Sequence, residues 1–104
     1  MSVRIIKPST VRGFERRHSG AAAALEHWLE VVKAAHWRTL HDVRRSFRSA
    51  DEVGVRSGRT VVVFNIGGNR YRLIAAIHYN RQKVFVLRFM THAEYDKERW
   101  KAEL

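Results

Sequence analysis

The sequence predicts an α+β fold in which helices cover one face of a small antiparallel sheet. Two observations support this class. Apolar residues recur at helical spacing in residues 21–35, whereas residues 60–90 are rich in β-branched and aromatic residues. Most helix-forming segments precede the strand-forming segments, and the two kinds do not alternate along the chain. This order favours α+β over α/β. We therefore expect about three or four strands, two or three N-terminal helices on one face, and a short C-terminal helix.

The N-terminal part is expected to contain a short strand and two helices. The segment VRII at residues 3–6 favours a strand, which Pro8 ends. Thr10 is placed to cap a short basic helix that reaches about Arg17. A longer helix is expected from Ala21 onward, with one apolar face. That face consists of Leu25, Trp28, Leu29, Val32 and Ala35.

A third helix is predicted after Thr39. Thr39 and Asp42 have the spacing of a capping box, in which the two side chains bond to backbone N–H groups at the helix start. The residues that follow alternate between apolar and basic types. Leu40, Val43 and Phe47 are expected to face the core.

Three strands are expected after Gly54, at residues 60–66, 69–79 and 83–90. The dipeptide Gly67-Gly68 and the segment NRQ separate them, and both are typical of hairpin turns. One sheet face should remain at least partly open. The final element, residues 91–101, is predicted to be a helix, because Thr91 and Glu94 form a second capping box.

The chain is strongly basic. Lys and Arg number 20 against 10 Asp and Glu, which gives a formal net charge of +10 on 104 residues. Such an excess favours nucleic acid, the ribosome, an anionic membrane or an acidic protein as partner. The lack of cysteine excludes disulfides and thiol catalysis. Without a long apolar segment or a signal peptide, we expect a single cytoplasmic domain over residues 1–104.

The second hairpin is expected to fix the register of the last two strands. If residues 80–82 form a three-residue turn, Tyr79 faces Lys83 and Arg72 pairs with Met90. A shift of one residue would turn every side chain of one strand to the other face. The predicted arrangement of the site therefore depends on this turn.

The predicted register places four candidate catalytic residues together. Arg72, Arg88 and His92 share one face of the sheet, and Tyr95 lies beside His92 on the C-terminal helix. Backbone N–H groups at the start of that helix also favour a phosphate. The same sheet face is expected to include Ile74, Ala76, Val84 and Val86.

This set suits metal-free cleavage of RNA. The neighbouring 2′-hydroxyl attacks phosphorus, so a protein must accept its proton, stabilise the charged phosphorus and protonate the leaving oxygen. Arg72 and Arg88 would hold the phosphate. His92 could accept a proton, and Tyr95 could donate one or stack on a base. The sequence leaves acid and base unassigned between His92, Tyr95 and the ribosome, and each residue also has an ordinary structural explanation.

The segment VFNIGGNRYRLIAAIHYNRQKVFVLRFMTHAEYDK resembles the core of the HigB toxins of bacterial toxin–antitoxin systems, within the RelE-like ribonuclease fold. The resemblance continues upstream through Trp28, Trp37, HDVRRSF and SADEV. It implies an mRNA interferase, an endoribonuclease that cuts messenger RNA in the ribosome. It also implies neutralisation by a HigA-type helix-turn-helix antitoxin.

Other basic residues are candidates for RNA binding without base recognition. Their type and position are equally compatible with solvated surface charge. They are Arg70, Arg81 and Lys83 at the turns, and Arg44, Arg45 and Arg48 in and after the third helix.

Two other functions compete with the nuclease. A non-catalytic module could bind ribosomal RNA through the basic open sheet, and substitution of His92 and Tyr95 would then change binding alone. A DNA-binding regulator is disfavoured, because no helix-turn-helix pair is visible. The histidines lack the spacing of metal ligands, so neither a metal nor another cofactor is expected.

Overall fold

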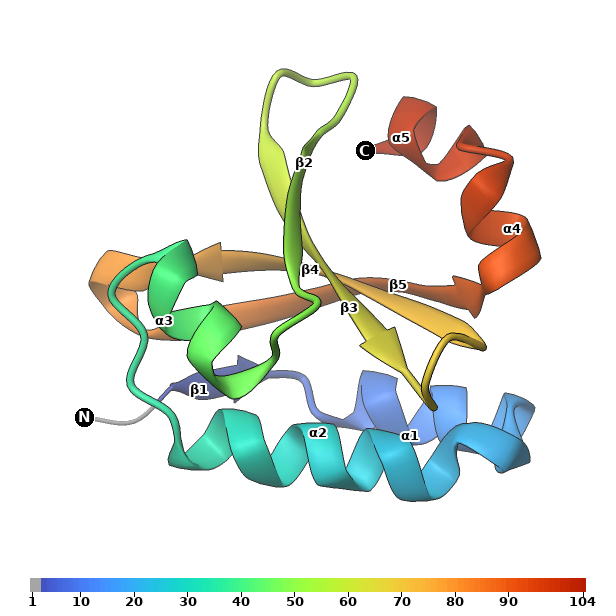
Figure 1. Cartoon of the computed structure of the whole chain (residues 1–104), viewed down its shortest axis with the longest axis horizontal. Helices are drawn as coiled ribbons and strands as arrows, with labels where there is room; N and C mark the ends of the chain where they lie inside the picture. The colour runs from blue at the N-terminus through green and yellow to red at the C-terminus, as the bar shows by residue number, and fades with distance from the viewer. Residues whose placement is uncertain (1–2) are drawn as a thin grey trace.

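The computed structural model describes residues 3–104, so residues 1 and 2 of the expected domain lie outside the described part. Within this range the chain forms a five-stranded sheet in the order β1-β5-β4-β3-β2 (Figure 1). The strands are β1 (Arg4–Ile6), β2 (Asp51–Gly54), β3 (Thr60–Ile66), β4 (Tyr71–His78) and β5 (Lys83–Thr91).

Helices occupy both faces of the sheet. In Figure 1, α1 and α2 lie side by side along one face, while α4 and α5 lie at the end of β5. The helices are α1 (Ser9–Arg17), α2 (Ala22–Ala34), α3 (Leu40–Ser46), α4 (His92–Asp96) and α5 (Arg99–Glu103), with short 3-10 turns at Ser19–Ala21 and Tyr79–Arg81. The α+β class and the N-terminal helices are confirmed.

The sheet has more strands than the three or four expected. The predicted first strand is present, but it pairs in parallel with β5, so the sheet is mixed. The additional strand β2 pairs antiparallel with β3. Its sequence DEVG is short and mostly exposed, and Asp and Gly are depleted in strands, which explains why propensity did not reveal it.

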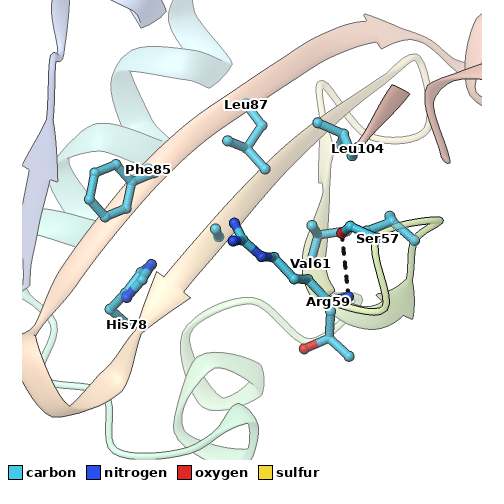
Figure 2. Close-up of a pocket in the computed structure, with 10 residues that line it drawn as sticks. Ser57, Arg59, Val61, His78, Phe85, Leu87 and Leu104 are labelled. Atoms are coloured by element: carbon cyan, nitrogen blue, oxygen red, sulfur yellow. Dashed lines mark hydrogen bonds between the residues drawn. The ribbon is translucent and has the colours of Figure 1, made fainter. Parts of the chain in front are cut away.

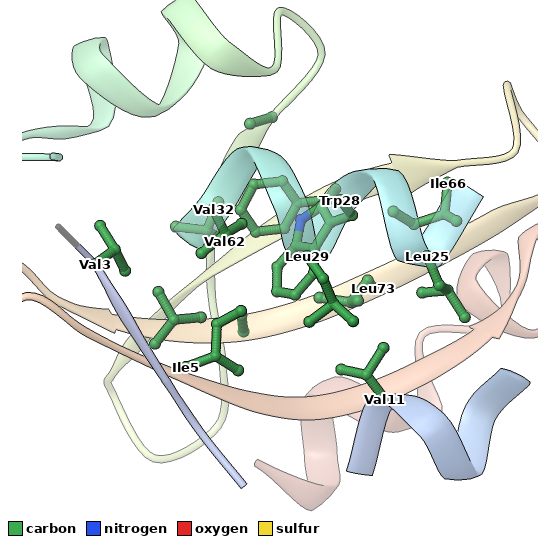
Figure 3. Packing of buried hydrophobic residues seen from close by; sticks show 14 of the residues in the cluster. Val3, Ile5, Val11, Leu25, Trp28, Leu29, Val32, Val62, Ile66 and Leu73 are labelled. Atoms are coloured by element: carbon green, nitrogen blue, oxygen red, sulfur yellow. The ribbon is translucent and has the colours of Figure 1, made fainter. Parts of the chain in front are cut away.

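The main core lies between the sheet and α1, α2 and α3 (Figure 3). Trp28 of α2 packs edge-on against Phe64 of β3, with ring centroids 5.4 Å apart. Leu73 and Val84 complete the floor beneath the helices and are fully buried. Burial of each large apolar side chain stabilises the fold by roughly 1.5–3 kcal/mol. Packing, rather than helix propensity, therefore holds α2 against the sheet.

The opposite face has a smaller core. Val61, Val63, Ile74 and Met90 of the sheet pack with Trp100 of α5. A backbone hydrogen bond of 3.0 Å from the N–H of Arg56 to the carbonyl of Lys101 ties the β2–β3 loop to α5. We name this side of the sheet the C-terminal face. It is covered only in part, which agrees with the expected open face.

The turn between β4 and β5 differs from the prediction. His78, not Tyr79, faces Lys83, and Gln82 adopts a left-handed conformation at φ 52°. Amide groups of Gln82 bond to the backbone of Trp37 and Tyr79, which holds this conformation in place. The turn is therefore one residue longer than expected.

A β-bulge at Leu87 restores the predicted register. Ala75 pairs with Val86 but Ile74 pairs with Arg88, so Leu87 is an extra residue. Arg72 consequently pairs with Met90, as predicted. The expectation for Val84 and Val86 is wrong, because both pack in the helix-side core, on the opposite face from Arg72.

The helix starts differ in how they are capped. At α4, Thr91 accepts a hydrogen bond from Glu94 N–H and Glu94 bonds back to the backbone of Thr91, so this capping box is confirmed. At α3, Thr39 makes no side-chain cap, and Asp42 accepts from the N–H of Arg38 instead. The expected continuous C-terminal helix is divided at Glu98, whose φ of 60° interrupts it.

Candidate active site

Arg72 is a cation buried at the C-terminal face. It is 7% exposed, and no other polar or charged residue of the described chain is buried to this degree. Its Nη1 donates to the carbonyl oxygens of Asn69 and Tyr71, at 3.3 and 3.1 Å. Its Nη2 donates to Asn69 Oδ1 at 2.6 Å and to His92 Nδ1 at 2.8 Å. All four acceptors are neutral.

The charge of Arg72 therefore has no carboxylate partner. None of the ion pairs formed within residues 3–104 includes this guanidinium. Burial of a charge is costly unless it is paired, and neutral acceptors satisfy its N–H groups without neutralising it. Such a group is suited to an anion that arrives from outside.

The turn between β3 and β4 positions the acceptors of Arg72. Gly67 and Gly68 have φ of 63° and 69°, a region in which residues with a Cβ are strained. This tight hairpin, predicted from the Gly-Gly pair, places the side chain of Asn69 against Arg72 of the next strand. Asn69 thereby fixes the direction of the guanidinium.

His92 uses both ring nitrogens. Because a guanidinium is only a donor, Nδ1 accepts from Arg72 and the ring proton lies on Nε2. That nitrogen is 3.0 Å from Asp96 Oδ2, one helical turn later. The N–H of His92 also donates to the carbonyl of Arg70 at 2.8 Å, which ties the start of α4 to β4. His92 thus accepts a hydrogen bond from Arg72 at one ring nitrogen and faces the Asp96 carboxylate with the other.

The backbone N–H groups at the start of α4 are less available for binding a phosphate than the sequence suggested. The N–H groups of His92 and Glu94 are already bonded, to Arg70 and Thr91. The helix spans five residues, so its dipole is small. An anion here would be held mainly by side chains.

Tyr95 lies beside Arg72. The guanidinium carbon is 5.5 Å from the centre of the Tyr95 ring, within the range of a cation–π contact. On α5, Trp100 stacks against Tyr95, with centroids 5.2 Å apart. Burial raises the pKa of the Tyr95 phenol above its ordinary value of 10.0, against smaller opposing effects of Lys101 and Arg72. Tyr95 is therefore a protonated phenol near neutral pH, not a base.

Arg88 lies on the same face as Arg72, diagonally across the β4–β5 pair. Diagonal neighbours in an antiparallel pair are about 7–8 Å apart. The Arg88 side chain is 42% exposed, and its Nε lies 3.8 Å from Glu103 Oε1 on α5. The structure thus brings Arg72, His92 and Tyr95 into contact and places Arg88 beside them, in an exposed ion pair.

The remaining predicted RNA-binding residues do not gather at this centre. Arg70 is adjacent, in the turn before β4. Arg81 and Lys83 lie at the other end of β4, about 20 Å away at 3.3 Å per residue. Arg44 belongs to α3 and pairs with Asp51. Arg45 and Arg48 are also exposed in this region, with α3 packed on the opposite sheet face.

Sequence reasoning missed two members of the site, Asn69 and Asp96. Asp96 follows His92 by four residues, the spacing that brings side chains together on a helix, so a signal was present. Asn69 gave a weaker signal, because Asn after Gly-Gly is an ordinary turn residue. Its role depends on the contact with Arg72, which only the folded hairpin creates.

Within residues 3–104, no group of three or more His, Cys, Asp or Glu side chains is placed to hold a metal ion. None of the helices in that range has the length and apolar character needed to cross a membrane.

The fold and the site define a basic α+β protein whose sheet presents a buried, uncompensated arginine next to a histidine. Residues 21–98 match the family model for the HigB toxin, described as the RelE-like toxic component of a toxin–antitoxin system. The chain belongs to the HigB toxin family. This confirms the resemblance, and membership of such a system implies an antitoxin as partner.

Individual relatives support the same assignment. The chain is 31% identical over 93 residues to the mRNA interferase HigB of Escherichia coli O6:H1 (strain CFT073). The aligned region covers 89% of this chain and 88% of that relative. It is 47% identical over 34 residues, 33% of each chain, to the mRNA interferase toxin HigB of Escherichia coli K12. The mRNA interferase HigB of Shigella flexneri matches to the same extent.

Proposed function

We propose that this chain is an mRNA interferase, an endoribonuclease that cuts messenger RNA on the ribosome without a metal ion. The names of its relatives and its membership of the HigB family support this proposal. The observation that carries it is the buried guanidinium of Arg72, bonded to His92 and without a carboxylate partner. This arrangement combines a phosphate-binding cation with an imidazole, a side chain suited to general acid–base catalysis.

Phosphate binding would begin with two exchanges of partner. Arg72 would turn Nη2 from His92 to a non-bridging phosphate oxygen. Arg88 would release Glu103, an exposed and weak partner at 3.8 Å, and contact the same phosphate. Together the two cations would stabilise the negative charge that develops on the pentacoordinate phosphorus.

The first exchange also prepares the base. When Arg72 moves to the phosphate, the lone pair of His92 Nδ1 becomes available to the 2′-hydroxyl. Nδ1 would accept that proton while the 2′-oxygen forms its bond to phosphorus. Asp96, at His92 Nε2, would stabilise the imidazolium that results. Substrate binding and activation of the base are thus one event.

Tyr95 would complete the reaction as the acid. As the bond from phosphorus to the 5′-oxygen breaks, the protonated phenol would donate its proton to that oxygen. The products would be a 2′,3′-cyclic phosphate and a free 5′-hydroxyl. Solvent would then carry the proton from His92 back to Tyr95 and reset the site.

The proposal includes two partners. The ribosome would align the messenger with the site, since holding reactants in position contributes strongly to rate. A HigA-type antitoxin would neutralise the toxin, because acidic or apolar surface complements a cation-rich protein of net charge +10.

The test is induced expression followed by mapping of mRNA 5′ ends. The wild type should arrest growth and produce new ends, whereas His92→Gln should lower cleavage by about 10²–10⁴-fold. Arg16→Gln, on the exposed surface of α1, is the control for a substitution away from the site and should cut like the wild type. Equal cleavage by wild type and His92→Gln would remove His92 from the mechanism. RNA binding without new ends would instead support a non-catalytic module.

A further inference from the structure

A recess lies on the C-terminal face, further along β5 from Arg88. It has a volume of about 360 Å³ and lies between the β2–β3 loop, the sheet and the end of α5 (Figure 2). We name it the β5 recess. Its lining residues are Val55, Ser57, Arg59, Thr60, Val61, Ala76, His78, Phe85, Leu87 and Leu104.

The β5 recess combines an apolar floor with an aromatic wall. Ala76 and Val61 lie on the sheet beneath it, and Leu87 continues the floor toward Arg88. On one side, His78 and Phe85 form an edge-to-face pair with ring centroids 5.0 Å apart. Figure 2 shows both rings on the same side of the recess. Aromatic side chains at such a surface are suitable for stacking on a planar ligand.

One permanent cation, Arg59, lines the β5 recess. Arg59 extends from the β2–β3 loop toward the strands, opposite His78 and Phe85 (Figure 2). The lining contains no Asp or Glu. A guanidinium offers paired donors to acceptor atoms on the edge of a planar ring. The recess therefore suits a flat, polar-edged group attached to an anionic chain.

Its position connects it to the proposed phosphate site. Phe85 and Arg88 are three residues apart on β5, about 10 Å at 3.3 Å per residue. The bulge at Leu87 turns Leu87 and Arg88 to the same face, so the floor of the recess runs directly to the cation. An RNA strand held by Arg88 would present a neighbouring base to the recess.

We propose that the β5 recess binds a nucleobase of the messenger, next to the scissile phosphate, and gives the enzyme a base preference. This inference rests on the proposed nuclease function. His78 and Phe85 would supply the stacking surface, and Arg59 would donate to the edge of the base. An apolar side chain of the antitoxin would also fit the floor of the recess. That occupant would not use the aromatic pair of His78 and Phe85, nor the position of the recess beside Arg88.

The first test compares the bases around the cut sites. Induced wild type should show a bias in base composition at one position beside the cut. Phe85→Leu keeps an apolar side chain without the aromatic ring, and Arg59→Gln removes the paired donors. Each should flatten the bias and slow cleavage at preferred sites by about tenfold, the size of a lost stacking contact. Arg16→Gln should preserve the bias.

The second test measures binding of RNA in the β5 recess without cleavage. A trinucleotide with 2′-O-methyl groups cannot be cut, because it lacks the nucleophile. Titrated into protein with 13C-labelled methyl groups, it should shift the signals of Ala76 and Leu87. The same trinucleotide with an abasic centre should not. This experiment remains informative if the wild type makes no cuts, which would overturn the nuclease function alone.

Any of three results would overturn the proposal. The first is an unchanged cut-site profile in both variants, and the second is an absence of methyl shifts with the trinucleotide. The third is weaker binding of the co-expressed antitoxin to Phe85→Leu and Arg59→Gln, with cleavage unaffected. The third result would assign the recess to protein docking. Thermal melting of each variant checks folding, and Arg59 is exposed, so its replacement leaves the core intact.

Discussion

The guanidinium of Arg72 donates to Nδ1 of His92 across 2.8 Å, and this contact occupies the only lone pair of the neutral imidazole. The cation therefore blocks the base until another acceptor replaces the ring. A phosphate is such an acceptor. The contact thus links substrate binding to proton transfer.

Replacing Arg72 with Met should separate activity from stability. We expect cleavage to fall by about 10²–10³-fold, because a principal stabiliser of the charged phosphorus is lost. The midpoint of urea unfolding should change little, because removal of the buried, unpaired charge offsets the loss of its four hydrogen bonds. Primer-extension rates and urea titrations measure the two effects. A lower midpoint with normal cleavage would show that Arg72 is purely structural.

Two substitutions of Asp96 should distinguish orientation from charge. Asp96→Asn keeps an acceptor for His92 Nε2–H but lacks the negative charge, whereas Asp96→Ala removes both. We expect a moderate loss of cleavage in the first and a larger loss in the second, with thermal melting unchanged because the side chain is exposed. Equal, unaltered rates in both variants would exclude Asp96 as the positioning residue for His92.

Glu103→Gln should strengthen RNA binding. The substitution frees Arg88 from its only carboxylate partner among the described residues. Exposed ion pairs are weak, so we expect affinity for a non-cleavable RNA to rise about two- to threefold at low salt. Glu98→Gln removes the same charge from the pair with Lys101 and is the matched control. An equal gain in both variants would show a net-charge effect instead.

Tyr95→Phe should alter stability at alkaline pH. Burial raises the pKa of Tyr95 in the folded state, so folding binds its proton more tightly. This contribution is complete below the unfolded pKa and is lost as pH rises through the folded pKa. The wild type should therefore lose more stability than Tyr95→Phe between about pH 8 and pH 11. Urea midpoints at both pH values measure the difference. Parallel curves would mean that the phenol titrates alike in both states.

Thr91→Val should destabilise the start of α4. The substitution removes a capping hydroxyl, which costs about 1 kcal/mol. Hydrogen bonds from Thr91 lower the pKa of Glu94, so the capping contribution should disappear as pH falls through the folded pKa of that carboxyl. Thr39→Val is the control, because Thr39 starts α3 without a side-chain cap. If both variants unfold at the same urea concentration, the capping box at Thr91 contributes nothing.

Much of the fold could be predicted because apolar residues recur in the sequence at the spacings typical of helices and strands. The apolar face of α2 follows from the helical spacing of apolar residues in the sequence. The pairing of Arg72 with Met90 was predicted from a three-residue turn that the structure lacks, and it is present because the bulge at Leu87 offsets the longer turn. The strand β2 could not be found in this way, since Glu52 and its neighbours are polar and only the pairing with β3 makes them a strand. Local propensity does not contain that tertiary information.

The site was predictable to a similar extent. The sequence pattern of residues 69–101 predicted that Arg72, His92 and Tyr95 lie together, and the structure shows them in contact. The roles of Asn69 and Asp96 were not predicted, because they act by directing another side chain. Arg81 and Lys83 were named as RNA-binding candidates because they are basic residues at a turn, and the structure places them at the far end of β4 from Arg72. Charge identifies a class of partner but not a location.

The extra residue at Leu87 also affects which changes in chain length the fold can accept. Loss of Leu87 would convert β5 to a regular strand and leave Arg88 and Met90 on their present side. Loss of Phe89 would instead turn Met90 toward the helices and displace the start of α4. Homologous sequences that differ in length within this strand should therefore gain or lose a residue at the bulge. A change of length at that position keeps Arg88 and Met90 on the face that carries the candidate active site.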